Sequence, residues 1–243
     1  IINPYNQETI FTVAEGTKED VERAILAARR SFEDGEWSLE TSEVRGKKVR
    51  AVADKIKENR EELAKLETLD TGKTLEESYA DMDDIHNVFM YFAGLADKDG
   101  GEIINSPIPN AESKVVKEPV GVVTQITPWN YPLLQASWKI APALATGCSL
   151  VMKPSEITPL TTIRVFELME EVGFPKGTIN LILGAGSEVG DVMSGHKEVD
   201  LVSFTGGIET GKHIMKNAAN NVTNIALELG GKNPNIIFDD ADF

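Results

Sequence analysis

The second half of the chain repeats one pattern, in which a short apolar segment of strand length is followed by a segment with helical spacing. Strands of this kind, separated by helices, are typical of a parallel sheet that is covered on both faces. We therefore predict an α/β fold with a doubly wound, Rossmann-like parallel sheet. The predicted strands are residues 120–126, 149–153, 179–183, 199–204 and 224–229. One helix is predicted over 133–145, and a second from an N-cap at Thr158 to a stop at Gly173. Two more helices are predicted after the third and fourth strands.

The first hundred residues have the spacing of helices instead. Thr17 and Asp20 resemble a capping box, which predicts a helix start. Apolar residues then recur at helical spacing over 21–32, over a second helix from 49 towards 69, and over a third at 85–92. We treat these apolar faces as core, and expect residues 1–99 to form a helical N-terminal region.

Residues 100–118 differ from both neighbours. Two extended pieces, 102–105 and 113–117, are separated by Pro107 and Pro109, which predicts a protruding two-stranded ribbon. An isolated ribbon is marginally stable, so we expect a second subunit to cover it. The Rossmann-like part then runs over residues 119–230.

Charge and composition exclude several classes of function. The chain has 24 basic and 39 acidic residues, a net charge of −15, which argues against nucleic-acid and anionic-membrane partners. No apolar stretch approaches the roughly eighteen residues of a membrane span, and the start lacks the features of a signal peptide. Cys148 is a single cysteine, and the three histidines are scattered, so we predict no disulfide and no metal site. We expect a cytoplasmic globular protein.

Ligands of doubly wound sheets bind at the carboxyl ends of the strands, and two of these ends in the sequence are rich in glycine. The run from Gly184 through Gly186 to Gly190 is one residue longer than the dinucleotide fingerprint, and an ordinary glycine turn explains it equally well. Gly206 and Gly207 precede a helix, where free amides favour a phosphate, although a tight turn is the alternative.

Polar residues at the strand ends are candidates for binding and catalysis. Glu156 and Lys153, after the second strand, suit ribose hydroxyls, but a solvated loop has the same composition. Asn130 can donate to an oxyanion and Glu228 can accept a proton, while each can equally be a turn or cap residue. For Cys148, at the start of an apolar strand, a buried and inert thiol is the default.

Five ordered blocks resemble the signatures of the aldehyde dehydrogenase superfamily: ITPWNYP, APALATGC, VMKPSE, SFTGGIETG and ALELGGKNPNIIF. Two further blocks, INPYNQE and LETLDTGK, resemble its N-terminal part, so the likeness covers essentially the whole chain. The resemblance implies oxidation of an aldehyde to an acid with NAD or NADP. A cysteine thiolate attacks the aldehyde, hydride passes to the nicotinamide, and water hydrolyses the thioester.

The resemblance also implies roles for single residues. It makes Asn130 the oxyanion-hole amide and Glu228 the general base, and it places Lys153 and Glu156 at the adenosine ribose. Glu156 then favours NAD over NADP. The other implied cofactor-binding residues are Ile126, Thr127, Trp129 and Ser155, with Gly186, Phe204, Gly206 and Gly207 flanking the adenine and pyrophosphate.

Two departures from the family pattern are visible. Many members carry Ser where this chain has Gly207, which removes a hydroxyl contact to the pyrophosphate. The family's nucleophilic cysteine lies beyond the ELGG block, in a catalytic domain of which this sequence would include only the start, residues 231–243. Cys148 lies in a different block, so the resemblance does not make it the nucleophile. Whether the chain is a fragment or naturally ends at Phe243 stays open, and we expect this chain alone to be inactive.

The resemblance extends to substrate and assembly. The block NYPLLQASWKIAP looks most like the betaine aldehyde branch, and Tyr131 and Trp138 offer aromatic faces to a quaternary ammonium. The implied product is glycine betaine. Residues 101–118 correspond to the family's oligomerisation ribbon, which implies a homo-oligomer, a dimer or a tetramer, and a monovalent cation is a further cofactor candidate.

Two other functions stay open. One is a truncated, non-catalytic module that binds a nucleotide or assembles through the ribbon. The other is a reductase of acyl phosphates or acyl-CoA, which Glu156 and Glu228 argue against.

Overall fold

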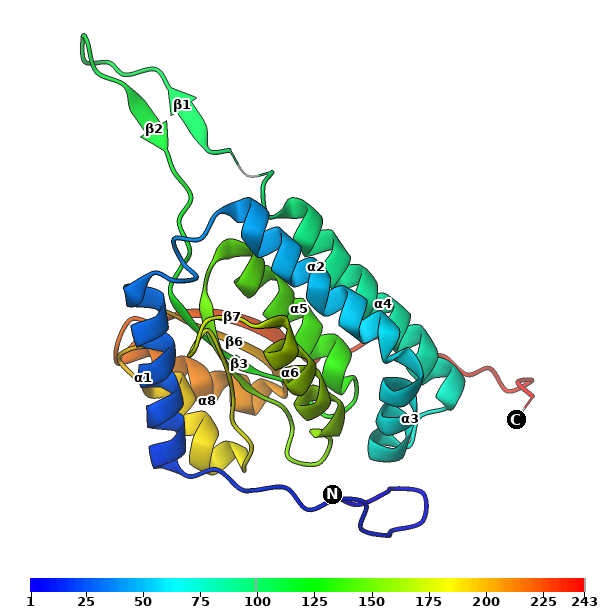
Figure 1. Ribbon diagram of the computed structural model, residues 1–243. Helices are drawn as coiled ribbons and strands as arrows, with labels where there is room; N and C mark the ends of the chain where they lie inside the picture. Colours follow the sequence, from blue (N-terminus) through cyan, green and yellow to red (C-terminus); the bar gives the residue numbers. More distant parts are fainter. Residues whose placement is uncertain (99, 243) are drawn as a thin grey trace.

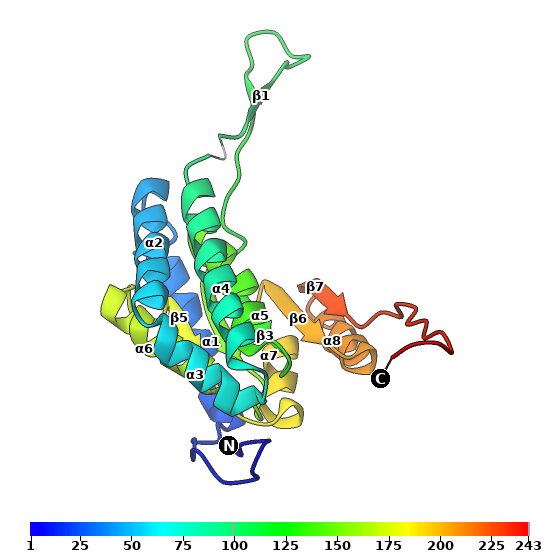
Figure 2. The ribbon, with the colours of Figure 1, turned by 90° about the vertical axis from the view of Figure 1, so that its right-hand side faces the viewer.

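A parallel sheet of five strands, in the order β5-β4-β3-β6-β7, forms the centre of the molecule (Figures 1 and 2). The computed structural model describes residues 1–98 and 100–242, so residues 99 and 243, which end two of the predicted domains, lie outside it. The predicted strands are confirmed, with the first and third each two residues shorter and the fourth shifted by two residues. The strands are β3 Val122–Ile126, β4 Ser149–Lys153, β5 Ile179–Leu181, β6 Leu201–Gly206 and β7 Asn224–Leu229.

Helices cover both faces of the sheet, which confirms the doubly wound α/β prediction. Val122 and Val151 point into a core with α1, α7 and α8, whereas their neighbours Val123 and Leu150 point into a second core with α2 to α6. The helices are α1 Lys18–Asp34, α2 Ser42–Glu58, α3 Arg60–Thr71, α4 Leu75–Leu95, α5 Pro132–Thr146, α6 Leu160–Val172, α7 Asp191–Gly195, which follows a π-helical turn Gly186–Gly190, and α8 Ile208–Ala219.

Two helix predictions need correction. The single helix expected from residue 49 towards 69 is divided at Asn59, whose backbone leaves the helical region and whose side-chain amide donates to the Lys55 carbonyl. The apolar spacing continues across this break, so the sequence does not reveal it.

The start of α6 also differs from the prediction. The helix begins at Leu160, and the Asp70 carboxylate from α3 accepts the Leu160 N–H at 2.9 Å. The expected cap residue, Thr158, instead donates its hydroxyl to the Trp129 carbonyl at 3.2 Å. A tertiary contact therefore replaces the local cap.

The predicted ribbon is present as the antiparallel pair β1 Glu102–Ile104 and β2 Ser113–Val115. It projects away from the sheet and helices (Figures 1 and 2). Apolar side chains on it face outwards; Ile103 is 82% exposed. Over residues 1–98 and 100–242, no helix has the length and apolar character needed to span a bilayer.

Candidate functional site

A cleft of about 800 Å³ lies at the carboxyl end of the sheet, between the loop after β3, helix α5 and the face of β6 and β7. Figure 2 shows β6 and β7 extending past α5, which leaves this face of the two strands uncovered. Six of the residues singled out from the sequence line the cleft: Trp129, Asn130, Trp138, Gly206, Gly207 and Glu228.

The two catalytic candidates reach the cleft from different elements. Asn130 lies in the loop between β3 and α5, where the Trp129 carbonyl is held by Thr158. Glu228 lies near the end of β7, and strand register places it beside Thr205 of β6. An amide donor and an exposed carboxylate therefore line one cleft. The amide can donate a hydrogen bond to a developing oxyanion, and the carboxylate can accept a proton.

Lys139 of α5 is a cleft residue that sequence reasoning missed. Its ammonium donates to the Ser203 hydroxyl at 3.1 Å. Burial lowers the pKa of Lys139 to about 8, against an opposing effect of the Glu228 carboxylate. The available signal was that Lys139 is the one charged residue of α5, because a buried charged group needs a partner.

The ribose candidates lie at the end of β4, beside the sheet edge. The Lys153 ammonium donates to the Glu156 carboxylate at 3.2 Å and to the Pro154 carbonyl at 3.0 Å. Burial lowers the pKa of Lys153, and Glu156 opposes that shift. Glu156 lines a separate pocket of about 220 Å³ together with Leu183 and Gly184, while Ser155 is buried next to it.

The remaining candidates lie outside the linings of these two pockets. Ile126 and Phe204 are buried in the core with α1, α7 and α8, and Gly186 begins the π-helical turn. The Thr127 hydroxyl is buried without a hydrogen-bond partner. Tyr131 precedes α5, and its ring lies 4.1 Å from the Lys73 ammonium.

The glycines at the end of β6 fit a phosphate-bearing cofactor. A Cβ on Gly206 would lie 2.5 Å from the Phe204 ring, whereas the space beside Gly207 is open. Gly207 is the N-cap of α8 and makes no side-chain cap, so the helix presents free amides there. The buried Thr205 hydroxyl in the same lining has no partner. Together with the Lys153–Glu156 pair, these groups fit a dinucleotide.

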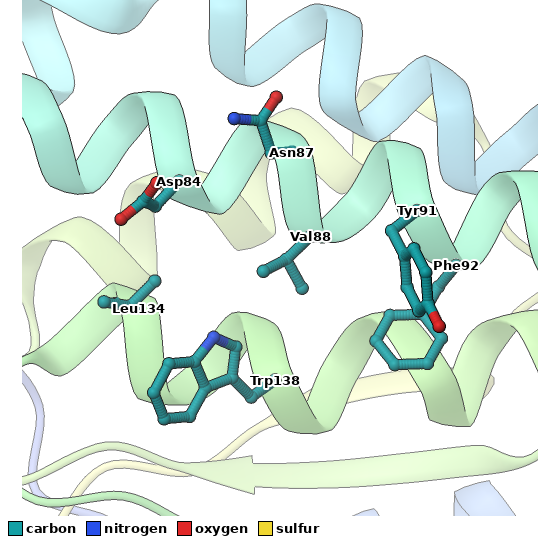
Figure 3. A pocket seen from close by; sticks show the side chains of 7 residues that line it. All are labelled: Asp84, Asn87, Val88, Tyr91, Phe92, Leu134 and Trp138. Atoms are coloured by element: carbon teal, nitrogen blue, oxygen red, sulfur yellow. The ribbon is translucent and has the colours of Figure 1, made fainter.

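A shallow groove of about 490 Å³ between α4 and α5 adjoins the cleft through Trp138, which lines both (Figure 3). In Figure 3 the Trp138 indole and Leu134 rise from α5 towards Val88 and the Asp84 carboxylate of α4. The sequence assigned Val88 and Phe92 to the core and did not single out Asp84. The groove combines aromatic faces with a carboxylate.

Cys148 is buried at the start of β4, as expected for an inert thiol. Among the described residues, no group of three or more histidine, cysteine and acidic side chains could hold a metal ion.

Comparison with known proteins gives the family. A model of the aldehyde dehydrogenase family matches residues 1–243. The chain is 69% identical to the betaine aldehyde dehydrogenase of Bacillus subtilis and 49% identical to aminoaldehyde dehydrogenase 2 of Zea mays, covering 100% and 99% of this chain and 49% of each relative. The chain therefore spans about half the length of these curated relatives.

Solved structures agree with this assignment. The crystal structure of betaine aldehyde dehydrogenase from Staphylococcus aureus in complex with NAD+ is similar with a TM-score of 0.96 and 93% sequence identity. The match covers 100% of this chain and 48% of that one. The fold, the ordered sequence blocks and these matches together show that the chain belongs to the aldehyde dehydrogenase family.

Proposed function

We propose that this chain supplies the NAD site, the oxyanion amide and the general base of an enzyme that oxidises betaine aldehyde to glycine betaine. The observation that carries the proposal is that Asn130 and Glu228 line one cleft with the open N-terminus of α8. The name of the 69% identical relative and the NAD+ complex of the 93% identical structure support it.

In the proposed reaction, the Asn130 amide donates to the carbonyl oxygen as a cysteine thiolate adds to the aldehyde carbon. That cysteine is not Cys148, which is buried. Bound NAD+ would supply the hydride acceptor, and loss of the hydride from that carbon would leave a thioester. Glu228 then takes a proton from the water that attacks the thioester, which releases the acid and the thiol.

Glu156 is the proposed reason for preferring NAD to NADP. Its carboxylate, paired with Lys153 at the end of β4, would accept hydrogen bonds from ribose hydroxyls and repel a 2′-phosphate. The two glycines, Gly206 and Gly207, would leave room for the pyrophosphate at the start of α8. Ile126, Thr127, Trp129, Ser155, Gly186 and Phe204 complete the proposed cofactor region.

The groove between α4 and α5 is the proposed route of the substrate's quaternary ammonium. Trp138 offers an aromatic face and Asp84 a carboxylate in this groove, and each attracts a cation that has no N–H donor. Tyr131, the second aromatic candidate, lies outside the groove lining, beside the Lys73 ammonium. An isosteric neutral aldehyde, 3,3-dimethylbutanal, has the same shape without the charge.

This proposal predicts a charge-specific effect at the groove. Trp138→Ala and Asp84→Asn should each raise the KM for betaine aldehyde about 5- to 30-fold, because a partly desolvated cation loses about 1–2 kcal/mol of attraction. The KM for 3,3-dimethylbutanal should change less than twofold for Asp84→Asn. The matched control is Asp83→Asn, whose carboxylate pairs with Arg60. Equal effects on both aldehydes would contradict this substrate assignment.

Assembly and location are parts of the same proposal. The exposed apolar side chains of the ribbon support homo-oligomer contacts, a dimer or a tetramer, through residues 101–118. We also propose the division at residues 99, 118 and 230, a cytoplasmic location, and a monovalent cation to which no residues are assigned. The net charge of −15 supports the absence of nucleic-acid and membrane partners.

A further inference from the structure

A buried ionic cluster lies where α3, α4 and α6 meet, outside the cleft lining. We call it the Lys73 cluster; it consists of Glu67, Lys73, Asp81 and Thr161. The Lys73 ammonium lies 2.5 Å from the Asp81 carboxylate and 3.9 Å from the Glu67 carboxylate. The Thr161 hydroxyl donates to the other Glu67 oxygen at 2.6 Å. These contacts fix the position of the ammonium.

Stability alone does not account for such a cluster. Replacing a buried ion pair by apolar residues is often neutral or stabilising, because removing charges from water is costly. The cost is visible at Glu67: burial raises its pKa to about 7, although Thr161 and Lys73 oppose this shift. One Glu67 oxygen also lacks a hydrogen-bond partner. The fixed ammonium also has a contact outside the cluster.

The ammonium of Lys73 also faces an aromatic ring. It lies 4.1 Å from the centroid of Tyr131, which is within the range of a cation–π interaction. Tyr131 is 44% exposed, and the Lys73 ammonium is one of the groups that contact its ring. Tyr131 directly follows Asn130, and its carbonyl accepts the first hydrogen bond of α5 from Gln135.

The loop that carries Asn130 is thus held on both sides of that residue. On one side, Thr158 at the start of α6 donates to the Trp129 carbonyl. On the other, Lys73 holds the Tyr131 ring. Both contacts come from the junction of α3 and α6, which two hydrogen bonds join: Leu160 to Asp70 and Thr161 to Glu67.

We propose that Lys73 is a positioning residue for the oxyanion amide: its ammonium, fixed by Asp81 and Glu67, holds the Tyr131 ring and thereby the adjoining Asn130. Lys73 is absent from the lining of the cleft and acts through Tyr131. The inference rests on the proposed aldehyde oxidation, in which the Asn130 amide must lie within hydrogen-bond distance of the reacting oxygen.

The first test is Lys73→Met in the form of the enzyme that oxidises aldehydes. We expect kcat to fall about 5- to 30-fold, as for the loss of a partly desolvated cation–π contact, with NAD affinity unchanged within twofold. The matched control is Lys65→Met, which removes an exposed lysine paired with Glu61 on the same helix. A kcat that stays within twofold of the control overturns the proposal.

A second variant separates positioning from folding. Lys73→Met alone leaves the Asp81 carboxylate buried without its cation, which is destabilising. The double variant Lys73→Met/Asp81→Asn removes both charges, and Glu67 can take up a proton because its pKa is about 7. We expect its Tm to recover towards that of the unmodified protein while kcat stays low. Recovery of kcat together with Tm would show a structural role and overturn the proposal.

The ring can be tested as the intermediary. If Lys73 acts through the aromatic face of Tyr131, its removal should still lower kcat in a Tyr131→Phe background, which keeps the ring. In a Tyr131→Leu background, the same removal should change kcat less than twofold. Equal effects in both backgrounds would overturn the role of the ring.

A last readout does not depend on catalysis. Amide hydrogen exchange over residues 129–135 should be faster in Lys73→Met/Asp81→Asn than in the unmodified chain, with exchange over 201–206 unchanged. Unchanged exchange over 129–135 overturns the positioning role even if the enzyme is active. Faster exchange without aldehyde oxidation in any form of the protein would support the contact and contradict the proposed function instead.

Discussion

Glu228→Gln is expected to lower steady-state aldehyde oxidation by about 10²- to 10⁴-fold, the range for loss of a general base. The glutamine keeps the shape of the side chain beside Thr205 but cannot take a proton from water. The thioester should then form and persist. A rapid-mixing experiment should therefore show a first turnover of NADH followed by a slow steady state, with NAD affinity unchanged within about twofold.

The control for this variant is Glu209→Gln. Glu209 lies in the first turn of α8, is exposed and pairs with Lys212, so its loss should leave both phases intact. The assay requires a form of the protein that contains the nucleophilic cysteine. Steady-state turnover that equals the control would remove Glu228 from the mechanism.

Asn130→Ala is expected to lower the rate of the first turnover by about 10²- to 10³-fold, the usual effect of losing one oxyanion donor. The amide lies in the loop that Thr158 and Lys73 hold, so the donor is positioned before the aldehyde arrives. The two variants should slow different steps. Asn130→Ala should slow the first formation of NADH, whereas Glu228→Gln should slow the later hydrolysis of the thioester. Asn221→Ala, two residues beyond the end of α8, is the matched control. An unchanged burst rate would contradict the role of Asn130.

The sheet, and the presence of Asn130 and Glu228 in one cleft at its carboxyl end, could be predicted from the sequence for one physical reason. The strands are short apolar runs, and parallel strands bring their carboxyl ends to the same edge, however far apart they lie in the sequence. Two residues that are 98 positions apart in the sequence are therefore expected at the same end of the sheet. The resemblance of the sequence blocks to the family then suggested the roles that are proposed for these residues.

The contacts that position the site could not be predicted in this way. The cap of α6 comes from Asp70, and Lys139 finds its partner Ser203 on a strand 64 residues later. Lys73 reaches Tyr131 across the junction of three helices. Such contacts depend on how helices pack, and the spacing of apolar residues does not specify this packing. The break at Asn59 could not be predicted either, because the apolar spacing continues across it.

The central claim is that this chain forms an NAD site in which Glu156 rejects the 2′-phosphate. The most direct measurement is a calorimetric titration of the purified chain with NAD+ and with NADP+, repeated for Glu156→Gln. We expect micromolar binding of NAD+, at least about tenfold weaker binding of NADP+, and loss of that difference in the variant. Equal affinities for the two cofactors, or a preference that survives Glu156→Gln, would contradict the claim.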